Sequence, residues 1–110
     1  MSDYITFKID PDKENIDRFV EYVKDKYPFS DTYHPKLPIS IKPHYHVGHE
    51  ARLFVEGTAY FVLDNETIVC EPGTYIEIKP KVPHSFYSTG EFKAIRFNQE
   101  YENWTAVDIV

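Results

Sequence analysis

The chain has 110 residues, of which 42% are hydrophobic and 27% charged, and this predicts one soluble domain around a single core. Its formal net charge of -6 comes without any cluster of basic residues, so we expect neither nucleic acid nor an acidic membrane surface as a partner. No apolar run approaches the roughly 18 residues needed to span a bilayer, and the polar start does not resemble a signal peptide, which predicts a cytoplasmic protein.

The N-terminal third of the chain predicts one strand, one helix and a connection. Residues 4–9 alternate as a strand does. Asp10 and Pro11 form a good helix start, with Asp10 as the N-cap and Pro11 at the first helical position. Apolar residues then recur at helical spacing to about Lys26, at Ile16, Phe19, Val20 and Val23. Residues 28–38 contain several prolines and predict an irregular connection.

From residue 39 onward, short alternating or β-branched runs follow one another at close spacing. The predicted strands cover residues 39–46, 50–55, 59–64, 67–70, 75–79, 84–88 and 92–97. Turn residues separate them, at Gly57, Asp64-Asn65, Pro72-Gly73, residues 80–83 and Gly90. Many short strands, with 16% aromatic residues to fill an interior, are typical of a β-sandwich or barrel.

We therefore expect a single all-β domain over residues 1–110. Residues 1–38 would supply the N-terminal strand, helix and loop, residues 39–100 the barrel, and residues 101–110 a C-terminal tail.

Three histidines and one glutamate stand at spacings that suit metal ligands. His44 and His46 are two residues apart on a predicted strand, so their side chains share a face. Glu50 follows closely and His84 lies on a later strand. Imidazole and carboxylate together suit first-row metals such as iron, nickel, manganese or zinc. A single buried histidine is usually just hydrogen-bonded, but the four residues as a set favour metal ligation over a decayed site that keeps only the fold.

Glu50 can join the two histidines only if the chain turns after His46. In one straight strand, His44 and Glu50 would lie about 20 Å apart at roughly 3.3 Å per residue. Gly48 permits a turn because glycine adopts positive φ without steric cost, and this predicts two antiparallel strands. Four ligands leave positions open on a six-coordinate metal, where a bidentate substrate, water or dioxygen could bind.

Strand parity places further residues beside the predicted ligands. Arg52 and Phe54 should share the interior face of Glu50, whereas the opposite face takes Ala51, Leu53 and Val55. A buried guanidinium needs an anion, so Arg52 is a candidate catalytic residue that offsets negative charge on a substrate. Arg52, Phe54 and Arg96 are candidate substrate-binding residues. Alternatively, both arginines are structural ion-pair partners of Asp or Glu.

The remaining reactive side chains have simpler interpretations. His49 lies in the turn at odd parity and is expected to be a solvated loop residue, with a ligand or proton shuttle as the alternative. His34 is assigned no role. Cys70 sits in an apolar run and is expected to be a buried core residue, not a catalytic thiol. Lys79 and Lys81 are expected to be solvated loop charges, with anion binding as the alternative.

At these residues the chain resembles the cupin superfamily. The spacing of His44, His46, Glu50 and Gly57 is that of the first cupin motif, and the interval from Gly73 to His84 is that of the second. Within the cupins it is most similar to the acireductone dioxygenases of methionine salvage, in a short, N-terminally reduced form. The resemblance rests on residues 44–57, on residues 83–86, and on residues 93–97 with the following Glu102-Asn103-Trp104. Two departures are Gly48-His49 in place of an acidic pair, and Lys79 and Lys81 in place of a proline and a glycine.

The resemblance implies a small single-domain cupin, which is a double-stranded antiparallel β-barrel of jelly-roll type with one N-terminal helix. It implies that iron(II) or nickel(II) is held by His44, His46, Glu50 and His84, with manganese or zinc as further candidates, and that Arg52 and Arg96 lie near the substrate. The implied reaction is metal-dependent cleavage of acireductone, or of a similar small enediol or dicarbonyl, by dioxygen.

Two other functions are compatible with the same residues. One is a cupin isomerase or another small-molecule oxygenase, because one barrel hosts many chemistries. The other is a non-catalytic, metal-dependent sensor or small-molecule binding module. A homodimer is a further expectation, in which Tyr4, Phe7 and Trp104 would cover the interface, although these residues could equally pack the helix.

Overall fold

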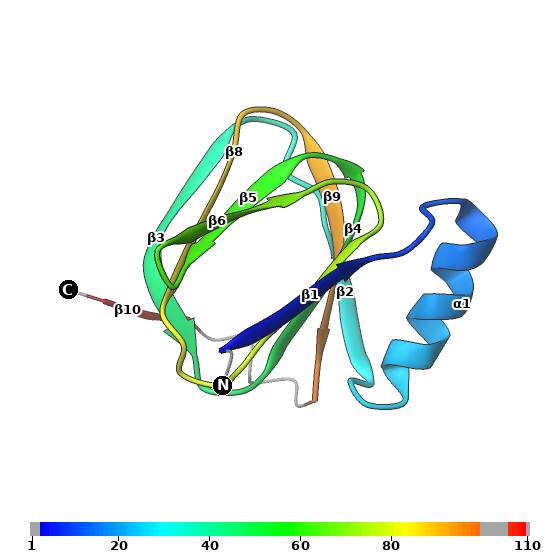
Figure 1. Cartoon of the computed structure of the whole chain (residues 1–110), viewed down its shortest axis with the longest axis horizontal. Helices are drawn as coiled ribbons and strands as arrows, with labels where there is room; N and C mark the ends of the chain where they lie inside the picture. The colour runs from blue at the N-terminus through cyan, green and yellow to red at the C-terminus, as the bar shows by residue number, and fades with distance from the viewer. Residues whose placement is uncertain (1–2, 100–105, 110) are drawn as a thin grey trace.

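The computed structural model describes residues 3–99 and 106–109. These residues form one helix and ten strands, which make two five-stranded antiparallel sheets (Figure 1). In chain order the elements are β1 (Tyr4–Lys8), α1 (Lys13–Lys24), β2 (Phe29–Tyr33), β3 (Ile39–His46), β4 (Glu50–Gly57), β5 (Ala59–Leu63), β6 (Glu66–Cys70), β7 (Thr74–Ile78), β8 (His84–Ser88), β9 (Phe92–Asn98) and β10 (Ala106–Asp108). No helix within these ranges is long and apolar enough to cross a membrane.

The two sheets enclose an apolar interior. The first sheet has the strand order β1-β7-β4-β9-β2 and the second has the order β10-β3-β8-β5-β6. Figure 1 shows that the two sheets together form a barrel, with α1 outside it. The inner core combines Phe54 and Ile76 of the first sheet with Phe61 and Phe86 of the second. The predicted all-β barrel with one N-terminal helix is therefore confirmed.

Helix α1 packs on the outer face of the first sheet, as its apolar spacing requires. Ile16 and Val23 of the helix join a second core cluster with Leu53 of β4, Tyr75 of β7 and Phe97 of β9. Val55 packs against the same cluster and Ala51 belongs to it, whereas Phe54 lies in the inner core. The predicted division of β4 into an inner and an outer face is confirmed.

The start of the helix differs from the prediction. Asp12, not Asp10, is the N-cap, and its carboxylate accepts a 2.8 Å hydrogen bond from the backbone N–H of Asn15. Asp10 instead accepts from the backbone N–H of Asp12 at 3.1 Å, in the turn before the helix. Because aspartate suits both positions, Pro11 alone could not indicate which one caps the helix.

Two strands were not predicted. Residues 28–38 were expected to be irregular, but β2 pairs with β9 from Phe29 opposite Asn98 to Tyr33 opposite Ala94. The prolines of this segment flank β2 and leave its hydrogen bonding intact. The expected C-terminal tail contains β10, which pairs with β3. All three residues of β10 are exposed, so no apolar alternation marks it in the sequence.

Several turns depend on left-handed backbone. Asp64 and Asn65, with φ of 53° and 61°, form the two-residue loop between β5 and β6, the geometry that such hairpins favour. Gly73 has φ of 93°, and a Cβ there would lie 2.2 Å from the carbonyl oxygen of Ile9. Lys81 has φ of 64°, although a side chain is disfavoured in this conformation. Its backbone N–H donates to the carbonyl of His46 at 2.8 Å, so this strained residue holds the end of β3.

We predict that Lys81→Gly raises the free energy of unfolding by about 1 kcal/mol, because glycine adopts positive φ at no steric cost and keeps the bond to His46. Thermal unfolding of the purified variant should show a rise in Tm of about 4 °C. Lys79→Gly is the matched control, since it removes the same charge where φ is not positive and should lower the stability slightly. Equal shifts in both variants would show that charge, not backbone conformation, is responsible.

Candidate metal centre

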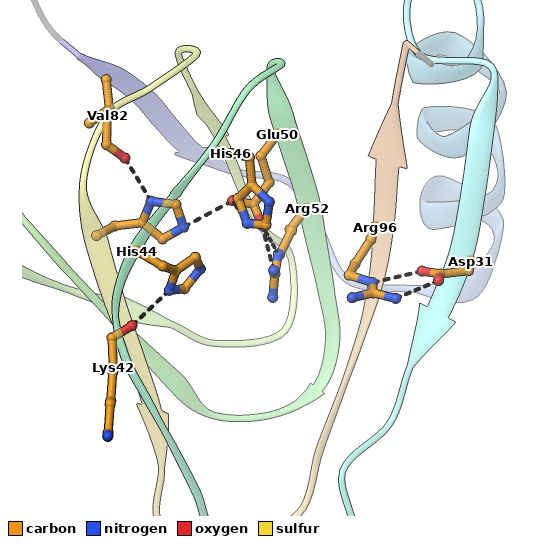
Figure 2. Close-up of polar contacts among 9 residues, drawn as sticks. Asp31, Lys42, His44, His46, Glu50, Arg52, Val82 and Arg96 are labelled. Atoms are coloured by element: carbon orange, nitrogen blue, oxygen red, sulfur yellow. Dashed lines mark hydrogen bonds and ion pairs between the residues drawn. The ribbon is translucent and has the colours of Figure 1, made fainter. Parts of the chain in front are cut away.

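The four predicted ligands come together at one end of the barrel. His44 and His46 close β3, Glu50 opens β4, and His84 opens β8. All four are buried, with exposed fractions between 3% and 8%. Figure 2 shows His44 and His46 of β3 near Glu50 of β4.

A bulge in β3 turns His44 toward the interior. Ile41 pairs with Phe86, but His44, not Pro43, is opposite His84, so β3 contains one extra residue here. Without it, Pro43 would occupy the position facing His84 and His44 would point outward. Proline is tolerated at such a position because a bulged residue need not donate to the ladder.

The turn after His46 is confirmed, but its form is not as predicted. Residues 47–49 connect β3 of one sheet to β4 of the other, so the two strands are not partners. Gly48 does not have the positive φ expected of it, since the described glycines with positive φ are Gly57 and Gly73. A crossing between two sheets does not need the left-handed residues that a tight hairpin requires.

The histidines present their ring nitrogens to one another. One nitrogen from each of His44, His46 and His84 lies within 4.8 Å of the others. Nδ1 of His44 is 2.7 Å from the carbonyl of Lys42, and Nδ1 of His84 is 3.0 Å from the carbonyl of Val82. A carbonyl can only accept, so in the neutral rings Nδ1 carries the hydrogen and Nε2 keeps its lone pair for a metal.

The two carboxylate oxygens of Glu50 have different neighbours. Its Oε1 accepts from Nε of Arg52 at 2.7 Å and also contacts Nη2 of Arg52. Its Oε2 lies 3.1 Å from Nε2 of His84 and 3.5 Å from Nε2 of His46. This arrangement leaves one oxygen of Glu50 directed at the histidine nitrogens.

Several buried atoms at this point have no hydrogen-bond partner among the described residues: His46 Nδ1 and Nε2, Glu50 Oε2 and His84 Nε2. Oε2 of Glu50 and Nε2 of His84 therefore approach one another without forming a hydrogen bond. Orphaned buried polar atoms are costly, and a cation between them would satisfy three of the four. The site of three histidines fits a divalent metal.

The protonation states also suit a metal. Burial opposes ionisation of Glu50, but the charge of Arg52 and the neighbouring imidazoles outweigh it, so the pKa of Glu50 lies well below its ordinary value. Burial lowers the pKa of His46 despite the attraction of Glu50, which keeps this imidazole neutral near pH 7. Metal binding requires a deprotonated carboxylate and a neutral imidazole, and the fold provides these states at Glu50 and His46.

The two predicted arginines form separate ion pairs. Arg52 and Arg96 are directly opposite one another on β4 and β9, where like charges would repel. Arg96 donates from Nε and Nη2 to the two carboxylate oxygens of Asp31, at 2.8 and 2.5 Å. In Figure 2, Arg52 lies between the histidines and this second pair. The ring of Tyr33 is near both, 5.6 Å from the Arg52 guanidinium carbon and 4.8 Å from that of Arg96.

A cavity of about 180 Å³ opens beside the histidines. Both arginines line it, together with His44, His46, His84, Tyr33, Ile41, Phe61, Phe86 and Ala106. Asp31 and Tyr33 were not identified as site residues from the sequence, because β2 was not predicted. The apolar lining residues Ile41, Phe61 and Phe86 lie on predicted strands but were not identified as site residues either. Phe54 is fully buried and contacts Phe61, with ring centroids 6.1 Å apart. Phe54, a predicted substrate-binding residue, is therefore not among the residues that line the cavity.

The other reactive side chains lie apart from the cluster. The His49 ring is near Tyr27, with centroids 6.4 Å apart. His34 is 2.8 Å from a carboxylate oxygen of Glu91 at the surface. Cys70 is buried, and burial raises the pKa of its thiol to about 12, so it stays protonated.

Comparisons with known proteins give one family and several similar structures. A family model for the cupin domain matches residues 32–97, which is more than half of the chain. The chain is similar to acireductone dioxygenase from Bacillus anthracis with a cadmium ion in its active centre, with a TM-score of 0.73 and 18% identity over 94% of this chain and 82% of that chain. The comparison with curated proteins found no match.

Two further structures are similar at lower coverage. Salicylate 1,2-dioxygenase from Pseudaminobacter salicylatoxidans has a TM-score of 0.58 and 21% identity, over 64% of this chain and 20% of that chain. A structure of DMSP lyases has a TM-score of 0.64 and 17% identity, over 74% and 43%. At these identities the likeness establishes the fold.

We predict that Glu50→Ala and His84→Ala each reduce the metal that co-purifies with the protein to below about a tenth of the wild-type amount, because each removes a ligand. Elemental analysis of protein purified without added metal measures this. His34→Ala is the matched control, since it removes an imidazole outside the cluster. Unchanged retention in both ligand variants would refute the site.

A second prediction concerns the buried pair of Glu50 and Arg52. Arg52→Met should lower the free energy of unfolding of the metal-free protein at pH 7 by about 3 kcal/mol, because it leaves the Glu50 carboxylate buried without its partner. Adding Glu50→Gln should recover most of this loss, since no charge then remains buried. Urea unfolding of the wild type, both single variants and the double variant measures the coupling, and additive losses would contradict it.

The stabilisation by this pair also depends on pH in a defined direction. Because folding lowers the pKa of Glu50, the contribution is fully present above its unfolded value of about 4.3 and is lost as the pH falls through the folded value. Urea unfolding of the wild type and Arg52→Met at a series of pH values measures this, and the difference between their free energies of unfolding should be smaller at about pH 3 than at about pH 7. A difference that does not change with pH would contradict it.

Proposed function

Starting from the fact that this chain belongs to the cupin family, we propose that it is a metal-dependent dioxygenase that cleaves acireductone, or a similar small enediol or dicarbonyl, with dioxygen. The proposal rests on one observation: a cluster of potential metal ligands and two basic side chains lie at the same cavity. Three buried histidines and the free oxygen of Glu50 converge at one wall, and two guanidinium groups line the same space.

The proposed ligands are His44, His46, His84 and Oε2 of Glu50, and we propose iron(II) or nickel(II) as the metal. When bound, the metal would supply Lewis-acid and redox chemistry for the reaction with dioxygen. Glu50 is expected to bind through one oxygen, because its Oε1 is held by Arg52. Four protein ligands would leave room in a six-coordinate shell for two adjacent oxygens of a substrate.

Arg52 and Arg96 are the proposed substrate-binding residues. An enediol becomes reactive toward dioxygen as it loses protons and gains negative charge, and fixed guanidinium groups stabilise such charge when they are oriented in advance. Arg52 is fixed by Glu50, and Arg96 is fixed by Asp31. Phe54 would shape the cavity through its contact with Phe61.

The size and lining of the cavity restrict the substrate. A volume of about 180 Å³ equals the liquid volume of about six water molecules, so a compact molecule of few atoms fits best. Phe61, Phe86 and Ile41 line the space beside the polar groups. They would exclude bulk water and strengthen the electrostatic interactions inside.

A second candidate is a cupin isomerase or another oxygenase for a small oxygenated compound. It is favoured by the same arrangement, because two guanidinium groups next to a metal recognise any compact anion with adjacent oxygens. A non-catalytic binding or sensor function would use the cavity without turnover.

The proposed activity is tested by mixing iron-loaded and nickel-loaded protein with an acireductone under air and following substrate absorbance. We expect an acceleration over the same concentration of free metal, and loss of that acceleration in His84→Ala. The control His34→Ala should retain it. If the protein contains verified metal and does not accelerate the loss of substrate, the assignment is rejected, and turnover of another small oxygenated compound would favour the second candidate.

A further inference from the structure

A second cavity lies outside the barrel, between α1 and the outer face of the first sheet. Its volume is about 540 Å³, compared with about 180 Å³ for the cavity at the histidines. Small-molecule sites typically occupy about 300–1,000 Å³, with mostly apolar walls and a few convergent polar groups. The second cavity fits this description, and no step of the proposed dioxygenase reaction uses it.

Aromatic rings form one side of this cavity. Phe7 of β1, Phe19 of α1 and Tyr75 of β7 contact one another, with centroid distances of 5.0 to 5.9 Å. Tyr22 extends the wall, 6.0 Å from Phe19. Phe7 is 45% exposed and Tyr22 is 74% exposed, so their ring surfaces are accessible at the mouth of the cavity.

A carboxylate lies next to these rings. Glu77 of β7 accepts hydrogen bonds from the hydroxyls of Tyr27 at 2.8 Å and Tyr75 at 2.7 Å. Burial opposes its ionisation, but these hydrogen bonds and the charge of Lys26 outweigh burial, so the pKa of Glu77 is lowered and the group is charged. Asp25 also lines the cavity, which gives two carboxylates against the single ammonium of Lys26.

The ammonium group of Lys26 already lies in this setting. Nζ of Lys26 lies 5.2 Å from the centroid of the Tyr27 ring and 3.3 Å from Oε1 of Glu77. An ammonium group between an aromatic face and a carboxylate is the arrangement by which proteins recognise organic cations.

We propose that this outer cavity binds a small organic cation, a quaternary ammonium or protonated amine with apolar substituents. The cationic group would lie near Glu77, and the apolar substituents would lie against Phe7, Phe19 and Tyr22. The remaining negative charge favours a cation over a neutral or anionic ligand, and the aromatic faces favour an alkylated one over a hydrated metal ion. The site is independent of the metal centre, from which the first sheet separates it.

The proposal is tested with choline and its neutral analogue 3,3-dimethylbutan-1-ol, each titrated into ¹⁵N-labelled protein and followed by amide chemical shifts. Choline should give saturable shifts at residues of α1, β1 and β7, and the neutral analogue should bind at least about tenfold more weakly. Glu50→Gln, at the metal centre, should leave choline binding unchanged. Equal binding of the two compounds, or no saturable shifts at these elements, would overturn the proposal.

Variants locate the cation more closely. Glu77→Gln should weaken choline binding about tenfold, whereas Glu21→Gln, which removes the same charge from an exposed position of α1, should not. Lys26→Met should tighten binding, because it removes the ammonium that already contacts Tyr27 and Glu77. Lys26→Met keeps the test valid even if Glu77→Gln fails to fold, and weaker binding in Lys26→Met would contradict the proposal.

Discussion

The buried ion pair between Arg52 and Glu50 is the interaction on which the rest of the site depends. It keeps a carboxylate ionised inside an apolar barrel, and it occupies one oxygen so that the other faces His46 and His84. The two residues belong to one strand and are separated by one residue, so the period of a β-strand puts both on the same face. Arg52 thereby orients a proposed ligand, and because it lies opposite Arg96, both guanidinium groups line the cavity.

Local features of the backbone around this pair position the three histidines, the other proposed ligands. The extra residue in β3 rotates His44 into the barrel, and the left-handed Lys81 holds the end of β3 through its bond to His46. Backbone carbonyls orient His44 and His84. Together they bring buried ring nitrogens of His46 and His84 to a point where they have no hydrogen-bond partner among the described residues. A cation bound at that point would satisfy them.

Much of this could be predicted from the sequence because strands have a simple period. The inner face of β4, with Glu50, Arg52 and Phe54, and the joint use of His44, His46 and His84 follow from parity and spacing. β2 could not be predicted, because its residues Phe29–Tyr33 lie among prolines. They also include Asp31, whose partner Arg96 is on a strand far away in the sequence. The bulge in β3 leaves no mark in the hydrophobic pattern, and the choice between two aspartates as N-cap depends on local geometry. The predictions for Trp104 concern a residue outside those that the structure describes.

The central proposal is that a metal is bound by three imidazoles and one carboxylate, with positions left for substrate. X-ray absorption spectroscopy of the nickel-loaded protein tests it most directly, because it counts the imidazoles and the total ligands around the metal. The account predicts the scattering of three imidazoles within a shell of about six nitrogen and oxygen ligands, and the loss of one imidazole in His84→Ala. A closed four-coordinate shell, or a shell with one imidazole or none, would contradict it.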